Sequence, residues 1–136
     1  MDALSSIMKI AGSGMHAQSK RLEITSENVA NANSTSDTPG GEPYRRKTVT
    51  FGEMVDKSSG ASMVTIDDVG RDMSDFPMEY RPNHPGADAQ GYVKMPNVNT
   101  LVEMTDMREA SRAYEANMNM FANGRRMRDQ TIQMLK

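Results

Sequence analysis

Hydrophobic side chains recur at alternating spacings of three and four along residues 97–136. The series is Met104, Met107, Ser111, Tyr114, Met118 and Phe121, and it resumes at Ile132 and Leu135. This spacing places the side chains on one face of an amphipathic helix. No proline interrupts the stretch, and Thr100 and Glu103 have the spacing of a capping box at its start. We therefore expect a long C-terminal helix whose apolar face needs a partner.

A second series with the same alternation occupies residues 3–32. Its members are Leu4, Met8, Ala11, Met15, Gln18, Leu22, Thr25, Val29 and Ala32. Ala11, Gly12 and Gly14 lie on or beside this seam, where small side chains let a partner helix approach closely. Each glycine costs up to ~1 kcal/mol of helix propensity, so the helix is expected to depend on packing. It should end near Asn33, before a run of turn-forming residues.

The middle of the chain has the short alternating patterns of strands. Val49 and Phe51 share one face of a strand, and a second strand is expected over residues 63–69. Residues 91–95 form a third candidate strand. Residues 70–90 are rich in Pro, Asp and Gly, so we expect an ordered loop there.

These patterns predict a mainly α protein with a small β-rich insert. The expected ranges are an N-terminal helix over 1–33, a β-rich and loop-rich middle segment over 34–96, and a C-terminal helix over 97–136. The two long helices should pair as a coiled-coil-like domain.

Helices of unequal length cannot bury all their apolar positions against each other, so the remaining positions should pack between subunits. The candidate interface residues are Leu4, Met8, Ala11, Met15, Leu22 and Val29 on the first helix, and Met104, Met107, Tyr114, Met118, Phe121, Ile132 and Leu135 on the second.

Composition and charge argue against several classes of function. The net charge is −2, which gives no electrostatic case for nucleic-acid binding, and there are no cysteines for disulfides or thiolate metal sites. No run of apolar residues is long enough to span a membrane. The N-terminal residues lack the basic start of a cleaved secretory leader, so we expect any export to leave the chain uncleaved.

Sites for chemistry are few. His84, with Asp88 four residues later, is the remote candidate for catalysis, but the chain has only two histidines and a metal site needs three or four ligands. We therefore expect no cofactor and no enzymatic activity. The run Arg45, Arg46 and Lys47 is a possible docking patch for an acidic partner, or a charged edge strand that discourages unwanted pairing.

Six segments together resemble the flagellar basal-body rod proteins, in particular those of the proximal rod. They are residues 11–15 (AGSGM), 28–33 (NVANAN), 39–47 (PGGEPYRRK), 84–93 (HPGADAQGYV), 96–99 (PNVN) and 111–117 (SRAYEAN). The resemblance is collinear over nearly the whole chain. One departure is Glu27, where the family pattern implies a small polar residue.

The resemblance implies a structural subunit of the bacterial flagellar rod, located in the periplasm and exported by the flagellar type III apparatus without cleavage. Terminal helices would pair around a central channel and assemble into a helical tube that transmits torque. The implied partners are the rod subunits FlgB, FlgF and FlgG, the export-gate adaptor FliE, the export apparatus and further copies of the same chain. A stand-alone coiled-coil adaptor in the cytoplasm is the alternative.

Overall fold

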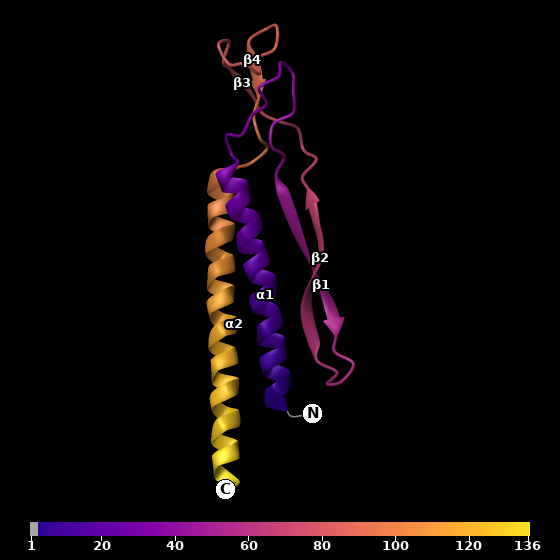
Figure 1. Cartoon of the computed structure of the whole chain (residues 1–136), viewed down its shortest axis with the longest axis vertical. Helices are drawn as coiled ribbons and strands as arrows, with labels where there is room; N and C mark the ends of the chain where they lie inside the picture. The colour runs from indigo at the N-terminus through magenta and orange to yellow at the C-terminus, as the bar shows by residue number, and fades with distance from the viewer. Residues whose placement is uncertain (1–2) are drawn as a thin grey trace. The chain divides into compact units, whose positions relative to one another are not determined.

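The computed structural model of the chain describes residues 3–136. Its elements are α1 (Ala3–Ala30), β1 (Lys47–Val55), β2 (Ser62–Arg71), β3 (Met78–Tyr80), β4 (Tyr92–Lys94) and α2 (Thr100–Met134) (Figure 1). Two long helices therefore flank two small sheets, one of β1 and β2 and one of β3 and β4. This confirms the prediction of a mainly α chain with a β-rich insert.

The chain folds into two compact units. The first contains the residues up to Leu22 together with Val49–Asp68 and Arg108–Lys136, and the second contains Glu23–Thr48 and Val69–Met107. The first unit is thus built from three separate segments of the chain and the second from two. The domain ranges 1–33, 34–96 and 97–136 stay predictions, and Met1 and Asp2 lie outside the described residues.

Small side chains bring α1 and α2 together in the first unit. Ala11, Ala17 and Ala110 are all buried. A Cβ atom added to Gly14 would lie 2.7 Å from Oδ1 of Asn117, and one added to Gly124 would lie 3.1 Å from Cγ of Met8. Gly14 of α1 meets Asn117 of α2, and Met8, which comes earlier in α1, meets Gly124, which comes later in α2. The two helices therefore run antiparallel.

The buried side of α2 is displaced by one residue from the predicted seam. Its residues Ala110, Asn117 and Gly124 follow at intervals of seven and face α1. Met104, Met118, Phe121, Ile132 and Leu135 are instead exposed, whereas Met107 and Tyr114 are half-buried. The pattern of apolar side chains does not predict this displacement. The residues in closest contact are the smallest ones, and they contribute little to a hydrophobic pattern.

The start of α2 also differs from the expected capping box. Asn99, and not Thr100, caps the helix, because its Oδ1 accepts hydrogen bonds from the amides of Leu101 and Val102 at 3.1 and 3.3 Å. The Glu103 carboxylate does not cap the helix and is bound by groups from other elements. At the other end of the insert, α1 ends at Ala30, close to the predicted stop.

The first sheet is a hairpin, and its part within the first unit, Val49–Asp68, packs on α1. Nζ of Lys9 donates to Oδ2 of Asp56 in the hairpin turn at 2.8 Å, and the amide of Val64 donates to Oγ of Ser13 at 3.1 Å. Successive residues of an α-helix are rotated by about 100° around its axis, so Lys9 and Ser13 lie on the side of α1 opposite to Ala11. Helix α1 therefore lies between α2 and the hairpin (Figure 1).

The second sheet lies in the second unit and includes a strand that the sequence pattern did not indicate. Strands β3 and β4 pair antiparallel, with Glu79 opposite Val93 and Tyr80 opposite Tyr92. The two tyrosine rings meet edge to face with centroids 5.3 Å apart, and Val93 is buried. Strand β3 falls within residues 70–90, where the many Pro, Asp and Gly residues predict a loop, and its three residues are too few to give a strand pattern.

Two neighbouring glycines of α1 provide a matched test of the helix packing. Gly14→Ala should destabilise the chain by about 1–3 kcal/mol, because the added methyl overlaps the Asn117 side chain. Gly12→Ala meets nothing within 4 Å and should stabilise it by about 0.5–1 kcal/mol through helix propensity. Urea unfolding followed by circular dichroism measures both, and equal effects of the two substitutions would contradict this packing.

Candidate functional site: a buried polar junction and exposed helix faces

Asn28 is the centre of a buried polar junction in the second unit. Its Oδ1 accepts hydrogen bonds from the Tyr44 hydroxyl at 2.8 Å and from the Lys47 amide at 2.9 Å. Its Nδ2 donates to the Lys47 carbonyl at 2.9 Å and to Oε2 of Glu103 at 3.1 Å. All four hydrogen-bonding positions of the carboxamide are thus used, as burial of the side chain requires. One side chain joins the last turns of α1, the start of β1 and the first turn of α2.

Glu103 supplies the negative charge of the junction. The side chain is 1 % exposed, and its Oε1 accepts a hydrogen bond from Nε of Arg46. A buried carboxylate is tolerated only when it is paired and hydrogen-bonded, and Arg46 and Asn28 meet both conditions. Glu27 accepts a hydrogen bond from Nζ of Lys47 at 2.5 Å and so adds a second ion pair beside the first.

Asn97 extends the junction to the segment after β2. Its Oδ1 accepts from the Arg46 amide at 2.8 Å, and its Nδ2 donates to the Asp72 carbonyl at 2.9 Å. The Asp72 amide in turn donates to the Arg46 carbonyl at 2.8 Å. Hydrogen bonds from the amide and hydroxyl of Ser74 lower the pKa of the Asp72 carboxyl. The residues leading into α2 are thereby fixed to the end of the hairpin.

Arg45, Arg46 and Lys47 already have partners inside the chain. The guanidinium of Arg45 donates to the carbonyls of Asp72 and Ser74 at 3.0 and 3.2 Å and lies 4.2 Å from the centroid of the Phe76 ring. Arg46 and Lys47 pair with glutamates of the two helices. The docking patch stays a prediction, and an acidic partner would have to compete with these contacts.

His84 and Asp88 shape the loop between β3 and β4. Nδ1 of His84 accepts from the Gly86 amide at 2.9 Å, and its Nε2 lies 3.0 Å from Oγ1 of Thr35. Oδ1 of Asp88 accepts from the amides of Gln90 and Tyr92 at 2.9 Å each. These bonds are those of turn residues. Across residues 3–136, no three His, Cys, Asp or Glu side chains gather in a group that could hold a metal ion.

The exposed positions of the two helices form the other candidate site. Among the predicted interface residues of α1, Ala11 is buried, and Leu4, Met8, Met15, Leu22 and Val29 are half-buried. On α2, the exposed fraction is 45 % for Met118, 49 % for Ile132 and 83 % for Leu135. Large apolar side chains thus remain uncovered on α2 in the single chain.

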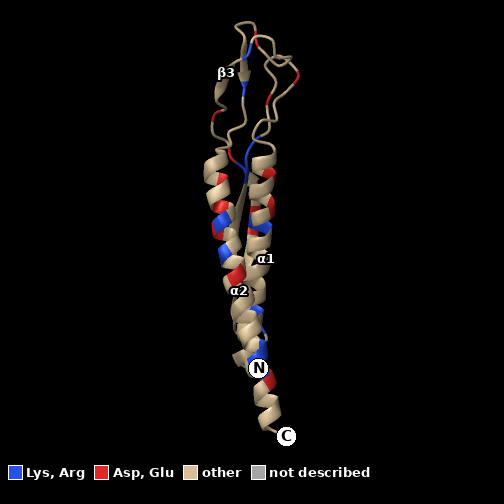
Figure 2. Cartoon of the chain, turned by 90° about the vertical axis from the view of Figure 1, so that its left-hand side faces the viewer, with Lys and Arg blue, Asp and Glu red and all other residues tan. Residues whose placement is uncertain are grey.

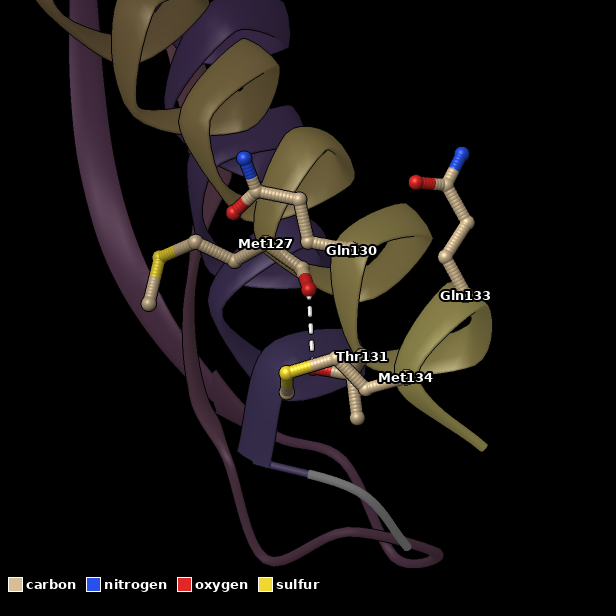
Figure 3. Close-up of a pocket in the computed structure, with 5 residues that line it drawn as sticks. All are labelled: Met127, Gln130, Thr131, Gln133 and Met134. Carbon is tan, nitrogen blue, oxygen red and sulfur yellow. Dashed lines mark hydrogen bonds between the residues drawn. The ribbon is translucent and has the colours of Figure 1, made fainter. Parts of the chain in front are cut away.

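Two shallow hollows lie along this part of the first unit. One, of about 410 Å³, is lined by residues of both helices, among them Ile10, Ala116 and Met120. The other, of about 440 Å³, lies near the end of α2 and is lined by Met127, Gln130, Thr131, Gln133 and Met134 (Figure 3). Thr131 donates to the Met127 carbonyl at 2.8 Å, so its hydroxyl is used within the helix. Most side chains that line these two hollows are apolar or carry amides, which suits packing rather than catalysis.

The comparisons with known proteins point to flagellar rod proteins. Residues 8–36 match the family model described as "Flagella basal body rod protein", and residues 89–134 match "Flagellar basal body rod FlgEFG protein C-terminal". A flagellar basal-body rod protein FlgC of Agrobacterium fabrum is 56 % identical over 136 residues, covering 100 % of this chain and 98 % of the relative.

More distant relatives carry the same name. FlgC of Escherichia coli O6:H1 is 42 % identical, covering 96 % of both chains, and FlgC of Bacillus subtilis is 34 % identical, covering 82 % of this chain and 84 % of the relative. The chain belongs to the FlgC family of flagellar basal-body rod proteins. The family is structural, and membership favours neither an enzyme nor a cytoplasmic adaptor.

The junction residues of this FlgC-family chain lie both within the matched segments and between them. Asn28 is in the first and Glu103 in the second, whereas Tyr44, Arg46 and Lys47 lie between them. The Asn-rich segment 28–33 is visible in the sequence, but its pairing with Glu103 is not, since neither Asn28 nor Glu103 is apolar. None of the described helices is long and apolar enough to cross a membrane.

Asn28 should be hard to replace. Asn28→Ala leaves the Glu103 carboxylate and both backbone groups of Lys47 short of partners, so we expect a loss of about 2–4 kcal/mol in the free energy of unfolding. Asn33→Ala, at an exposed position of the same Asn-rich segment, should change it by less than about 0.5 kcal/mol. Denaturant unfolding measures both, and a neutral Asn28→Ala would contradict the role of the junction.

Alkaline pH should weaken the same junction. Burial raises the pKa of the Tyr44 hydroxyl above its ordinary value of about 10. The raised pKa means that folding favours the protonated hydroxyl, and this adds to the free energy of unfolding. The added stability is complete below a pH of about 10 and is lost as the pH rises through the pKa of the folded chain. Tyr44→Phe should remove this part of the pH dependence. Measuring the free energy of unfolding of both chains at several values of pH, from neutral to alkaline, tests this. The same pH dependence in both chains would contradict it.

Proposed function

We propose that this chain is a structural subunit of the bacterial flagellar basal-body rod, where it assembles through its terminal helices into a helical tube that transmits torque and lines the export channel. The observation that carries this proposal is the combination of full-length similarity to FlgC proteins with large apolar side chains left exposed on α2. A helix that shows such residues to solvent is expected to pack against a neighbour.

The helical domain is proposed to act as a coiled-coil-like pair. Antiparallel contacts through Ala11, Gly14 and Gly124 support this, as does the recurrence of α2 contacts every seven residues. Close packing of small residues gives many short contacts that resist shear together. The polar junction at Asn28 would hold the insert firmly to the helices when torque is applied.

The location and the partners follow from the same proposal. The chain would lie in the periplasmic part of the basal body and reach it through the flagellar type III export apparatus, without cleavage. It would contact the rod subunits FlgB, FlgF and FlgG, the adaptor FliE and further copies of itself. Candidate interface residues on α2 are Met104, Met118, Phe121, Ile132 and Leu135, all of which are exposed in the single chain.

A charge placed on the exposed apolar side of α2 should block assembly. Ile132→Glu is expected to lower the amount of the chain in purified hook–basal bodies at least about tenfold, since burial of an uncompensated charge at an interface costs several kcal/mol. The measurement is an immunoblot of washed particles from source cells, scaled to another rod subunit.

The control is Met73→Glu, at a position that is 76 % exposed and outside both helices, which should leave the amount unchanged. Equal incorporation of Ile132→Glu and the unmodified chain would contradict the role of α2. Finding the unmodified chain only in the cytoplasmic fraction of flagellated cells would contradict the rod function itself.

A further inference from the structure

The side of α2 that packs on α1 continues past the described start of α1. The contacts of Gly14 and Met8 with α2 show that six residues back along α1 correspond to seven residues forward along α2. One further step of seven from Gly124 reaches Thr131, which then lies opposite a position before Ala3, the first described residue of α1. Figure 1 shows the C-terminal end of α2 beyond the N-terminal end of α1. No described residue of α1 therefore lies opposite the last turn of α2.

This uncovered end of α2 is apolar and uncharged. Leu135 follows Thr131 by four residues and so lies on the same side of the helix, with Ile132 beside it, and both apolar side chains are exposed. Residues 131–135 carry no charge, and Figure 2 shows this end of the helix in tan. The end of α2 thus presents a small apolar surface that continues the side which packs on α1.

An apolar groove lies along one side of the contact between α1 and α2. Its lining residues are Ile7, Ile10, Ala11, Ala116, Asn117 and Met120. None of them is charged, and Nδ2 of Asn117 already donates to the Ala113 carbonyl at 2.9 Å. Ile10 and Met120 are exposed, so the groove offers apolar surface to a partner. Its volume of about 410 Å³ falls within the range of pockets that enclose a bound ligand.

The end of α2 does not reach the groove of its own chain. Leu135 follows Met120 by 15 residues, which is about 22 Å along a helix that rises about 1.5 Å per residue. Because the helix between them is continuous, it holds these two positions apart. A contact between this end and the groove therefore joins two chains.

The two surfaces match in chemistry. An apolar helix that lies in a groove is held by side chains spaced three or four residues apart, and Ile132 and Leu135 have this spacing. Neither surface contains a charge, so their contact buries no unpaired charge. The groove adjoins the contact within the chain, since Ala11 and Asn117 belong to both, and the end of α2 continues the same contact. One contact between two copies covers both surfaces that the single chain leaves open.

We infer that the C-terminal end of α2 in one copy of this chain, residues 131–135, binds in the groove between α1 and α2 of a second copy, with Ile132 and Leu135 as its anchors. The inference rests on the proposed function, since it names the surfaces through which copies meet. The end and the groove are different surfaces, so the contact is heterologous and leaves each copy with one surface for a further copy. Such a contact repeats from copy to copy, as a growing assembly requires.

Disulfide formation in assembled particles tests this contact directly. The chain has no cysteine, so the double variant Met120→Cys, Leu135→Cys carries two thiols of known position. A disulfide needs Cα atoms within about 7 Å, whereas these two positions of one chain are about 22 Å apart, so the bond can form only between chains. Oxidation of purified hook–basal bodies that contain this variant should give a product of two chains, each of 15.0 kDa, and higher multiples.

The control is the double variant Met118→Cys, Leu135→Cys. Met118 is exposed and comes two residues before Met120, but the rotation of about 100° per residue places it on a different side of α2. This variant should give no product of two chains, and neither should Leu135→Cys alone.

The outcomes separate the inference from the proposed function. If the variant with Met120→Cys is present in the particles but gives no product of two chains, as when a different rod subunit fills the groove, the inference is overturned and the rod function stands. An equal yield from the Met118→Cys control would also overturn it, and so would a product from Leu135→Cys alone, since that indicates an isologous contact. Absence of the unmodified chain from the particles would overturn the rod function and the inference together.

Filling the groove with a larger side chain gives a second test that does not depend on the thiols. Ala116 lines the groove at an exposed position, so Ala116→Leu should leave the unfolding of the single chain unchanged and lower incorporation into the particles about fivefold or more, because it takes up the space of the anchors. Ala122→Leu makes the same change at an exposed position on a different side of α2 and should leave incorporation unchanged. Equal incorporation of these two variants would overturn the inference, and this comparison decides it if the thiol variants do not assemble.

Discussion

The carboxylate of Glu103 is buried at 1 % exposure, and the second unit is arranged around the need to compensate it. Arg46 supplies the opposite charge and Asn28 supplies a hydrogen bond, which places the start of β1 and the last turns of α1 beside the first turn of α2. Removing one partner from such a group leaves a buried charge without compensation, which is far costlier than losing a surface contact. The junction therefore fixes where each helix enters the insert.

Small residues determine how closely the helices then approach. Because Gly14, Gly124 and Ala110 occupy the contact, the larger side chains of α2 are turned outward, where Met118, Ile132 and Leu135 stay exposed. In a chain that acted alone, this would be a liability for solubility. In a rod subunit it has a purpose, since the surface left uncovered by the intrachain contact is available to neighbours in the assembly.

Periodicity was sufficient to predict the two helices and the β-rich insert, because long amphipathic patterns and dense turn signals dominate this sequence. It was not sufficient to predict the intrachain seam, which is made by alanine, glycine and asparagine and lies one residue from the row of methionines. The capping box at Thr100 was wrong because Asn99 is the cap and Glu103 is needed at the junction. Strand β3 was missed because its three residues are embedded in a stretch rich in Pro, Asp and Gly, which predicts a loop. The pairing of Asn28 with Glu103 links residues 75 positions apart, and hydrophobic periodicity contains no information about such polar contacts.

The Asn28 side chain holds the start of β1 in place. Amide hydrogen exchange at Lys47, measured by NMR on the folded chain, tests it most directly, because this amide donates to the Asn28 carboxamide. We expect slow exchange at Lys47, as slow as that of the amides in the middle of the hairpin, and fast exchange when Asn28 is replaced by alanine. Fast exchange at Lys47 in the unmodified chain, beside protected hairpin amides, would contradict it.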